Sequence, residues 1–385
     1  MNTSRYLIVG GGMSGDAAAA GIRAHDPDGA ITLVGEESHP PYKRPPLTKG
    51  LWKGGDEDKI WKGTAERGVE LVLGRRIVGL DLDARRATDD QGNEYVYEKL
   101  LLATGGRPRR LDRADDSVVY FRTLDDYRAL RAAADGGANV VVIGGGFIGS
   151  ELTAALLTVG AGVTMVFPEK AIGSRLFPAH LAQFVTGYYR EKGASVLAEE
   201  TVELVEAGHV TLGSGTVLEA DTVVAGLGIE PRTELAEAAG LPVDDGIVVD
   251  EYGRVDGRDD VFAAGDVASF PMSAIGRQFR VEHEDHANSH GKVVGENMAG
   301  AGQRYDHIPF FYSYLFDLGY EAVGEVDSRL ATVERWDEPD RKGVVAYVDD
   351  AQRPRGFLLW NTWDKVDAAT ELIRAAQPID EGQLV

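Results

Sequence analysis

The stretch RYLIVGGGMSG at residues 5–15 joins a short apolar run to a turn made of glycines. An apolar run of this length is typical of a buried strand, and the alanine-rich residues that follow, up to about His25, are typical of a helix. A second apolar run, ITLV, begins at Ile31 after a turn that contains Pro27 and Gly29. This order of strand, helix and strand predicts a βαβ unit.

The glycines of this turn, Gly10, Gly12 and Gly15, have the spacing GxGxxG. Such glycines permit a tight turn, let the backbone approach a pyrophosphate, and allow the helix to pack closely on the strand. The N-terminus of the following helix carries about half a positive charge and free N–H groups, which favour a phosphate. Glu36, at the end of the second strand, can accept hydrogen bonds from ribose hydroxyls. We therefore expect this unit to bind a dinucleotide.

The same plan returns in NVVVIGGGFIG at residues 139–149. A helical pattern follows at residues 150–160, and the apolar run VTMVF at residues 163–167 predicts another strand. The chain thus contains a duplicated βαβ unit. Because each copy can hold one dinucleotide, we expect two separate dinucleotides.

The second unit contains its own GxGxxG glycines and an acidic residue, Glu169, just beyond its second strand. A carboxylate at this position would accept a hydrogen bond from the adenosine 2′-hydroxyl and repel a 2′-phosphate, which favours NADH over NADPH. Arg175 lies close in sequence and could accept a phosphate, so NADPH remains an alternative. The glycines of this second turn are Gly144, Gly146 and Gly149.

Further strand patterns occupy the segment between the two units. They lie around residues 70–74, 76–83 and 97–106, and a polar loop near residues 114–117 follows them. We take this loop as the first domain boundary.

The sequence pattern changes at two places in the second half of the chain. After Gly246, the segments GIVVDEYGRV and DDVFAAGDVA are strand-like and are expected to return the chain to the first domain. From Tyr305 onward, aromatic-rich strand patterns precede a helix near residues 364–377. The predicted fold class is α/β, with two Rossmann-like dinucleotide-binding domains and a C-terminal α+β domain. The predicted ranges are 1–117 and 248–304 for the first domain, 118–247 for the second, and 305–385 for the C-terminal domain.

Composition excludes several kinds of chemistry. The chain has no cysteine, so a redox-active disulfide, a thiolate nucleophile and a cysteine-bound zinc or iron–sulfur site are excluded. The net charge of -22 disfavours nucleic acid and anionic membranes, which are themselves negatively charged. No apolar run reaches the roughly eighteen residues of a membrane span, and the first strand begins too early to leave room for a signal peptide. We expect a cytoplasmic protein without a nucleic-acid or membrane partner.

Several motifs occur in the same order as in a known superfamily. They are PYKRPPLTK, LLATGG, YFRTL, GGGFIGSEL, VFPEK, FAAGDVA, VEHEDHANSHGKVVGENMAG, LGYEAVGEVDS and KGVVAYV. With the two glycine turns they resemble the FAD/NAD pyridine-nucleotide oxidoreductases. Within them the chain is most similar to the apoptosis-inducing-factor-type flavoproteins, and next to the ferredoxin and rubredoxin reductases. The resemblance implies a glutathione-reductase-like architecture with FAD and NADH (NAD+) as cofactors.

The resemblance also implies a set of cofactor-binding residues. The first glycine turn and Glu36 would hold the ADP part of FAD, and Asp266 would bind the ribityl chain. Arg44 and Arg122 would make further contacts with FAD. The implied FAD-side residues are Gly10, Gly12, Ser14, Gly15, Glu36, Arg44, Lys49, Ala103, Thr104, Gly105, Arg122, Asp266, Glu282, His283 and Tyr312. The implied NADH-side residues are Gly144, Gly146, Phe147, Ile148, Gly149, Glu151, Glu169, Gly228 and Glu282.

A smaller group is implied at the reaction centre itself. Lys49 would lie beside the flavin and form an ion pair with Glu151, which would join both dinucleotide domains. Phe147 would cover the flavin until nicotinamide stacks there, although a plain packing role is an alternative. Glu282 would hold the nicotinamide amide, and His283 would lie against the flavin. Tyr312 falls where related proteins often have tryptophan. The implied catalytic residues are Lys49, Glu151, Phe147 and His283.

His283, His286 and His290 have helical spacing, so we weighed a metal site. The same spacing fits a helix whose histidines cap, pack or face solvent, and the resemblance already accounts for His283. No metal site is predicted.

The resulting functional prediction is hydride transfer from NADH to the N5 atom of FAD. Without a cysteine pair, the electrons must leave from the flavin to a quinone, oxygen, a dye or a redox protein. Two alternatives remain: a ferredoxin or rubredoxin reductase, which the net charge disfavours, and a redox-sensing protein. In the resembled family, NADH yields a stable flavin–nicotinamide charge-transfer complex and promotes dimerisation, so a homodimer that depends on NADH belongs to the second alternative.

Overall fold

The computed structural model describes residues 2–385, and the chain folds into two compact units. Unit 1 comprises Met1–Arg44, Glu57–Arg107 and Glu230–Pro309, and unit 2 comprises Pro45–Asp56, Pro108–Ile229 and Phe310–Val385. Each unit therefore combines segments that are distant in sequence. The four predicted domain ranges remain a prediction.

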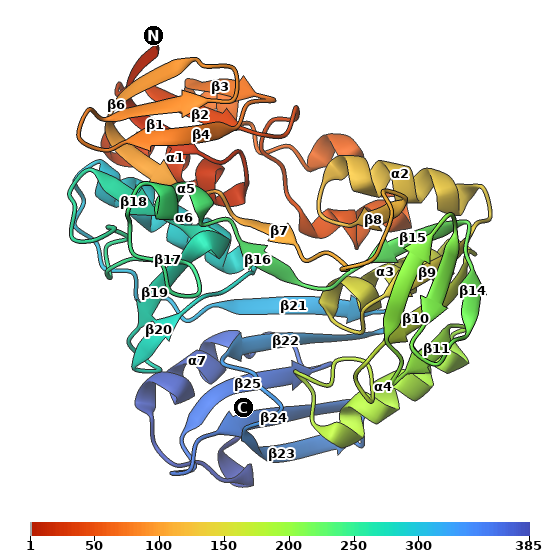
Figure 1. Ribbon diagram of the computed structural model, residues 1–385. Coiled ribbons are helices and arrows are strands. Elements are labelled where there is room, and N and C mark those ends of the chain that lie inside the picture. Colours follow the sequence, from red (N-terminus) through yellow and green to blue (C-terminus); the bar gives the residue numbers. More distant parts are fainter. Residues whose placement is uncertain (1) are drawn as a thin grey trace. The chain divides into compact units, whose positions relative to one another are not determined.

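Unit 1 is built on one mixed sheet with the strand order β3-β2-β1-β6-β5-β4, and β18 also pairs with β6 (Figure 1). The first four strands run parallel, as does β18, whereas β4 and β5 are antiparallel additions. Tyr6, Leu7 and Ile8 in the central strand are fully buried, as their apolar pattern predicts. The strands are β1 (Asn2–Val9), β2 (Ile31–Gly35), β3 (Val69–Leu73), β4 (Ile77–Asp81), β5 (Arg86–Asp89), β6 (Glu94–Leu102) and β18 (Val261–Ala263).

One predicted strand differs from the structure. The pattern at residues 97–106 predicts a single strand, but β6 ends at Leu102 and a separate strand, β7 (Gly106–Pro108), follows. Gly105 between them has φ 65°, a left-handed conformation that interrupts a strand. β7 pairs with β16 (Ile229–Pro231) instead of continuing the main sheet.

Two helices of unit 1 pack with their backbones almost in contact. These are α1 (Met13–His25), which follows the first glycine turn, and α6 (Glu284–Met298). A Cβ atom added to Gly295 of α6 would collide with the carbonyl oxygen of Ala18 in α1, and one added to Gly291 would lie 2.5 Å from the carbonyl oxygen of Ser14. Glycine on α6 is therefore what lets these helices approach. The remaining elements of unit 1 are α5 (Glu234–Ala238), β17 (Ile247–Val248), β19 (Ala268–Met272), β20 (Arg277–Phe279) and the single-turn helices η3 (Glu57–Lys59), η4 (Thr64–Arg67) and η5 (Gly265–Val267).

Unit 2 contains a fully parallel sheet with the order β11-β10-β9-β15-β8. The predicted second βαβ unit is present in it as β9, α3 and β10. The strands are β8 (Val118–Tyr120), β9 (Asn139–Ile143), β10 (Gly162–Phe167), β11 (Ser195–Ala198) and β15 (Thr222–Ala225), and the helices are α2 (Leu124–Asp135), α3 (Phe147–Thr158) and α4 (Ala179–Glu191). A small antiparallel sheet of β12 (Val202–Glu206), β13 (His209–Leu212) and β14 (Val217–Glu219) belongs to the same unit.

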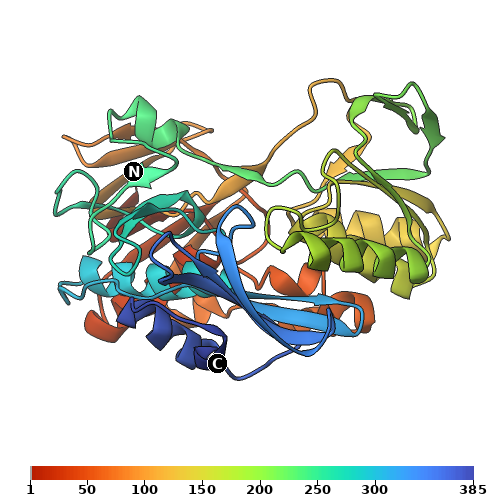
Figure 2. The same cartoon turned by 90° about the horizontal axis from the view of Figure 1, so that it is seen from below.

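The C-terminal part of unit 2 is an antiparallel sheet with the order β21-β22-β25-β24-β23, which appears as one twisted blue layer in Figure 2. Helix α7 packs on β22 and β25. Phe177 lies just before α4. Its ring makes edge contacts with Tyr320 and Trp360 of this sheet at centroid distances of 5.3 and 5.4 Å. The elements are β21 (Phe310–Leu315), β22 (Leu318–Gly324), β23 (Ala331–Glu338), β24 (Lys342–Val348), β25 (Pro354–Trp360) and α7 (Val366–Ala375), with the single-turn helices η1 (Pro45–Leu47), η2 (Gly50–Lys53) and η6 (Glu381–Gln383).

The α/β fold class with a C-terminal α+β region is confirmed. Within residues 2–385, none of the helices has the length and apolar character needed to cross a membrane.

The contact between α1 and α6 leads to a prediction of stability. Gly295→Val should lower the free energy of unfolding by about 3 kcal/mol, because the new side chain meets the α1 backbone and neither helix can yield locally. Urea unfolding followed by tryptophan fluorescence measures this. The control is Gly187→Ala in α4, where a Cβ meets nothing within 4 Å and should stabilise the helix by about 1 kcal/mol. Equal stabilities of the two variants would contradict the packing argument.

Candidate functional site

The first glycine turn closes tightly around the end of β1. Gly10 has φ 127°, and a Cβ there would collide with the carbonyl oxygen of Ala103, while one on Gly15 would collide with that of Gly10. A Cβ on Gly12, by contrast, would meet nothing within 4 Å. Gly12 is the N-cap of α1 and no side chain caps the helix. The open space and the uncapped N–H groups together fit a pyrophosphate.

The second turn has the same geometry. Gly144 has φ 117° and leaves no room for a Cβ beside the carbonyl oxygen of Gly226, and Gly149 leaves none beside that of Gly144. Gly146 faces open space and is the uncapped N-cap of α3. Both turns therefore fit the phosphates of a dinucleotide, one in each unit.

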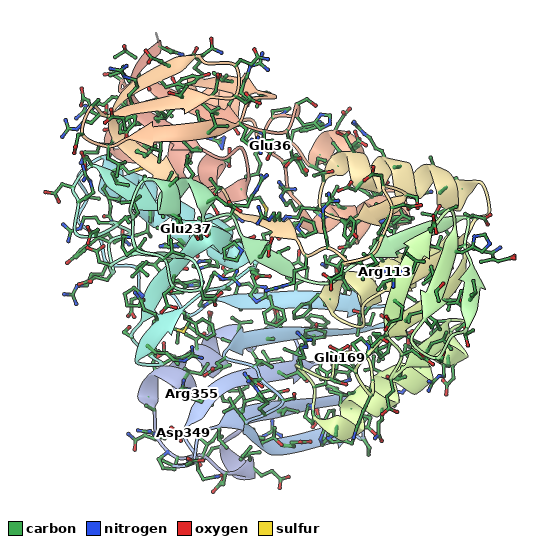
Figure 3. All side chains as sticks on the ribbon, viewed as in Figure 1. Glu36, Arg113, Glu169, Glu237, Asp349 and Arg355 are labelled. Carbon is green, nitrogen blue, oxygen red and sulfur yellow. The ribbon has the colours of Figure 1, made fainter. Side chains whose placement is uncertain are left out.

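Glu36, the predicted ribose ligand of the first unit, forms an ion pair with Arg232. The two segments are joined further, because Thr104 Oγ1 donates a hydrogen bond to the Arg232 carbonyl at 2.8 Å and the Arg232 N–H donates to Gly105 at 2.9 Å. The Glu36 side chain stays about half exposed, and it is labelled in Figure 3. Sequence reasoning missed Arg232, for which no motif gave a signal.

Arg44 is also held by neighbouring side chains of unit 1. Its guanidinium donates to Glu37, and it donates to the Tyr42 hydroxyl at 3.1 Å, while that hydroxyl donates to Glu37 at 2.5 Å. Burial alone would lower the pKa of Arg44, but Glu37 and then Tyr42 raise that pKa above its ordinary value. A fixed, charged guanidinium is suited to the predicted contact with an anionic cofactor.

Glu282 and His283 lie at the start of α6. Arg280 forms ion pairs with Glu282 at 2.6 Å and with Asp245 at 3.0 Å. His283 is the N-cap of α6, and its pKa is lowered to about 4 because burial outweighs the opposing charges of Asp266 and Asp285. The imidazole is therefore neutral at neutral pH, and its role against the flavin remains a prediction.

Two further histidines, His286 and His290, lie next to the Gly265–Asp266 turn. Gly265 has φ 77°, and its N–H donates to Nδ1 of His290 at 3.4 Å. His286 and His290 are completely buried, and their rings pack on Phe270. No group of residues with the composition of a metal site occurs in the part of the chain that the structure describes.

In unit 2, Lys49 and Glu151 form the expected ion pair. Lys49 Nζ lies 2.8 Å from both carboxylate oxygens of Glu151. The same carboxylate accepts hydrogen bonds from the hydroxyl groups of Thr48 at 2.5 Å and Ser313 at 2.6 Å. Glu151 is only 5% exposed, so these donors replace its contact with water. Thr48 and Ser313 were not predicted, although each is adjacent in sequence to a predicted residue.

The Glu151 carboxylate has aromatic neighbours and is shielded from water. Burial, and after it the charge of Glu151, raises the pKa of Tyr189 and of Tyr320 well above the ordinary value. Lys49 Nζ lies 5.4 Å from the centre of the Tyr312 ring, within range of a cation–π interaction. The Lys49 ammonium is thus fixed between a carboxylate and an aromatic face.

Phe147, the first residue of α3, keeps 40% of its surface exposed. Its ring meets Phe311 edge-on at a centroid distance of 5.0 Å. A large aromatic side chain beside the open Gly146 position is consistent with a cover over a bound ring, and this role remains a prediction. The simple packing alternative does not account for the exposure.

Glu169, which was predicted to select NADH and is labelled in Figure 3, forms an ion pair with Arg175 at 2.9 Å. The Arg175 side chain is 89% exposed, whereas that of Glu169 is 27% exposed. Ile148 and Gly228 lie near the second glycine turn. The Ile148 side chain lies against Gly226. Gly228 has φ 81° and its carbonyl accepts a hydrogen bond from the Arg109 N–H.

The remaining predicted FAD residues divide between the units. Ser14 and Asp266 belong to unit 1, where the Ser14 hydroxyl packs against Gly265. Arg122 belongs to unit 2, and its backbone N–H donates to Asp126 at 2.9 Å just before α2. Their contacts with a cofactor stay predictions.

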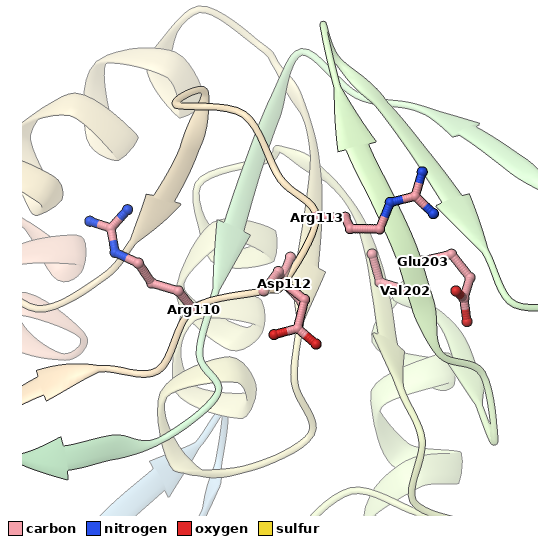
Figure 4. Close-up of a pocket in the computed structure, with 6 residues that line it drawn as sticks. Arg110, Asp112, Arg113, Val202 and Glu203 are labelled. Atoms are coloured by element: carbon pink, nitrogen blue, oxygen red, sulfur yellow. The ribbon is translucent and has the colours of Figure 1, made fainter.

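A separate hollow of about 320 Å³ lies between the loop before β8 and strand β12 (Figure 4). It contains neither a glycine turn nor a helix N-terminus, and charged side chains line most of it. In Figure 4 the Arg110 side chain points away from Arg113 and Glu203. We assign it no function. Its lining residues are Arg110, Leu111, Asp112, Arg113, Val202 and Glu203.

Comparisons with known proteins agree with this arrangement. The family model "Pyridine nucleotide-disulphide oxidoreductase" matches residues 4–291, and the model "Apoptosis-inducing factor, mitochondrion-associated, C-term" matches residues 294–341. The chain is 33% identical over 401 residues to the ferredoxin–NAD(+) reductase component of the anthranilate 1,2-dioxygenase system from Burkholderia cepacia, covering 100% of this chain and 97% of that protein. It is 33% identical over 424 residues to apoptosis-inducing factor 1, mitochondrial, from Dictyostelium discoideum, covering 98% and 79%.

Solved structures show the same similarity over nearly the whole chain. A chain of the covalent putidaredoxin reductase–putidaredoxin complex superposes with a TM-score of 0.92 at 28% identity, covering 99% of this chain and 95% of that one. The ferredoxin reductase for the CYP199A2 system from Rhodopseudomonas palustris gives a TM-score of 0.90 at 29% identity, covering 99% and 96%.

The ion pair leads to a prediction of stability. Lys49→Met should lower the free energy of unfolding by about 3–5 kcal/mol, because it leaves the Glu151 carboxylate buried without its cation. The double variant Lys49→Met/Glu151→Gln should recover most of this loss. Urea unfolding of both variants measures the difference. The control is Lys342→Met, which removes an exposed ion pair with Asp337 and should change stability by less than about 1 kcal/mol. Similar losses in the single and double variants would contradict the argument.

The buried histidines lead to a prediction of pH dependence. Burial lowers the pKa of His283 to about 4, that of His290 to about 3 and that of His286 well below its ordinary value. Below about pH 6.5 the unfolded chain therefore binds protons that the folded chain refuses, and stability falls as the pH falls toward 4. Each histidine contributes up to about 1.4 kcal/mol per pH unit.

Urea unfolding between about pH 7 and about pH 5 measures this slope. His290→Gln should reduce the slope of the unfolding free energy against pH, because one histidine fewer takes up a proton on unfolding. The control is His209→Gln in β13, which replaces an exposed histidine outside this cluster by the same residue type. An unchanged slope in His290→Gln would contradict the assignment.

Proposed function

Because the chain belongs to the pyridine nucleotide-disulphide oxidoreductase family, we propose that it takes hydride from NADH and passes the electrons to an acceptor other than a disulfide. The protein is an FAD-dependent NAD(P)H oxidoreductase with FAD and NAD(H) as cofactors. The preference for NADH and the nature of the acceptor are the parts that we propose.

The observation that carries the proposal is the Lys49–Glu151 network on the helix that starts at the second glycine turn. A dinucleotide whose pyrophosphate binds at Gly146 would lie along the start of α3, four residues before Glu151. An ion pair whose carboxylate is fixed by two hydroxyl groups holds the Lys49 ammonium in a defined position here. Bound FAD would supply the redox chemistry, by accepting hydride and releasing electrons.

The residues of this chain bind and orient the reactants. The N–H groups after Gly12 and Gly146 would hold the two pyrophosphates, and Asp266 would hold the ribityl chain. Phe147 would cover the site until the nicotinamide displaces it. No general base is required for hydride transfer.

The absence of cysteine rules out a disulfide acceptor within this chain. A redox protein is a second candidate, because relatives at 33% and 28% identity are named as reductases of ferredoxin and putidaredoxin. The net charge of -22 weighs against an acidic protein partner. A stable charge-transfer complex, an NADH-dependent homodimer and a cytoplasmic location remain predictions.

An anaerobic titration tests the proposal. The purified protein should be yellow, and NADH should abolish the visible flavin absorption stoichiometrically. At a low nucleotide concentration, NADH should abolish more of this absorption than NADPH does. Glu169→Ala should reduce the preference for NADH by about tenfold to a hundredfold, because a charge-assisted hydrogen bond and a repulsion are lost. Stopped-flow absorbance measures both.

The control is Arg175→Ala, which keeps the carboxylate and should keep or increase the preference for NADH. A colourless protein that takes up no flavin, or one that NADH does not bleach, would overturn the proposed function. An unchanged preference in Glu169→Ala would overturn only the role of that residue.

A further inference from the structure

One face of the C-terminal sheet in unit 2 carries aromatic side chains that are exposed. Alternation along β21 puts Tyr312 and Tyr314 on one face and the buried Ser313 on the other. Tyr314 is 45% exposed and its ring lies 5.8 Å from that of Tyr312. Since Tyr312 also contacts Lys49 Nζ, one end of this face lies next to the Lys49 ammonium.

Trp363 completes this aromatic face from the segment after β25. Its ring lies 5.7 Å from that of Tyr314 with an interplanar angle of 31°, and it is 39% exposed. Asn361 fixes the segment, because its N–H donates to the Gly319 carbonyl and its side-chain oxygen accepts from the Gly319 N–H, both at 2.8 Å. A Cβ on Gly319 would lie 2.8 Å from the Trp363 ring. Glycine at this position is thus required for the observed place of the indole.

A carboxyl group lies on the same face. Glu321 in β22 is the direct cross-strand partner of Tyr312, so both side chains project from one side of the sheet. Oxygen Oε2 of Glu321 is shielded from water and has no hydrogen-bond partner among residues 2–385. Burial, and after it the charge of Asp364, raises the pKa of Glu321 above its ordinary value. This carboxyl group is therefore more easily protonated than one in water.

We propose that the aromatic face formed by Tyr312, Tyr314 and Trp363 binds a neutral planar acceptor of the quinone class, and that Glu321 donates a proton to it. The proposal rests on the proposed function, for which it names the acceptor. The acceptor ring would stack on Tyr314 and Trp363, with a carbonyl oxygen toward Glu321.

The reaction balances with the groups named. NADH and a quinone, with one proton, give NAD+ and a quinol. The hydride provides both electrons and one proton, and the Glu321 carboxyl group provides the second proton to a quinone oxygen. Glu321 then regains a proton from water, so no residue of the chain is oxidised or consumed.

The charge and chemistry of the face favour this acceptor over others. The charge of Asp364 beside Glu321 would repel an anionic acceptor but not a neutral quinone. A one-electron redox protein needs no proton donor, and oxygen needs no stacking surface. Stacking on exposed aromatic rings and one protonatable carboxyl group are the combination that a quinone requires.

The experiment uses the FAD-loaded protein and a short-chain, water-soluble naphthoquinone. Calorimetry measures binding of the oxidised quinone without turnover, and stopped flow measures its reduction after NADH. Ferricyanide serves as an acceptor that takes one electron and no proton. NADH bleaching of the flavin is recorded for every variant, since it depends on the proposed function and not on this face.

Trp363→Ala should weaken quinone binding about tenfold, which is the loss typical of one stacking contact. Gly319→Ala should act in the same direction, because the new Cβ displaces the indole without removing it. Glu321→Gln should keep quinone binding but lower the rate of quinone reduction by about a hundredfold, with ferricyanide reduction unchanged. The control is Val217→Ala in β14, an exposed apolar residue that should change none of these values.

Quinone binding that is unaffected by both Trp363→Ala and Gly319→Ala would overturn the stacking site. Equal losses with quinone and ferricyanide in Glu321→Gln would overturn the role of Glu321 as a proton donor. Wild-type protein that NADH does not bleach would contradict the proposed function, while the calorimetric measurement would still decide whether the aromatic face binds a quinone.

Discussion

The carboxylate of Glu151 is the group on which the arrangement of unit 2 depends. It is buried in an aromatic environment, where an unpaired charge would be strongly unfavourable, so the chain must supply donors from several directions. Thr48 and Lys49 come from the segment after two prolines, and Ser313 comes from the C-terminal sheet. One charged group thereby ties the short segment Pro45–Asp56, helix α3 and strand β21 together. The same requirement holds the Lys49 ammonium against Tyr312.

The duplicated βαβ unit was predictable because its signal is local. A buried strand, a glycine turn and a helix follow one another, and the first and last glycine of each GxGxxG motif are required by a backbone contact within the same turn or beside a neighbouring strand. Other elements gave weaker signals. Helix α2 begins with a capping box of Thr123 and Asp126, a local signal that the sequence carries without an apolar run beside it. The strands β12 to β14 are short and half exposed, so neither an apolar run nor a clean alternation marks them.

The partners of the predicted site residues were less accessible to sequence reasoning. Arg232 pairs with Glu36 across 196 residues of chain, and Ser313 reaches Glu151 across 162. No spacing rule connects such positions, because the pairing follows from the packing of whole elements. The identity of Lys49 and Glu151 as partners came from the family resemblance and not from their separation in sequence. What the structure adds is the set of hydrogen bonds that makes each charge tolerable where it lies.

The two glycine turns share one backbone geometry but differ in the side chain that follows the open glycine. After Gly12 comes Met13, which is partly buried, whereas after Gly146 comes Phe147, which remains 40% exposed. Close packing on neighbouring carbonyl groups requires glycine at the outer positions of both turns, so those positions cannot carry any distinction between the two dinucleotides. The difference between the two copies therefore lies in Met13 and Phe147 and in residues outside the repeat. Arg232 and Thr104 are joined to each other near Glu36, and Arg175, Lys49 and Phe311 lie around the second unit. Duplication thus repeats one backbone geometry that fits a phosphate, and the elements that surround each copy make the two turns different.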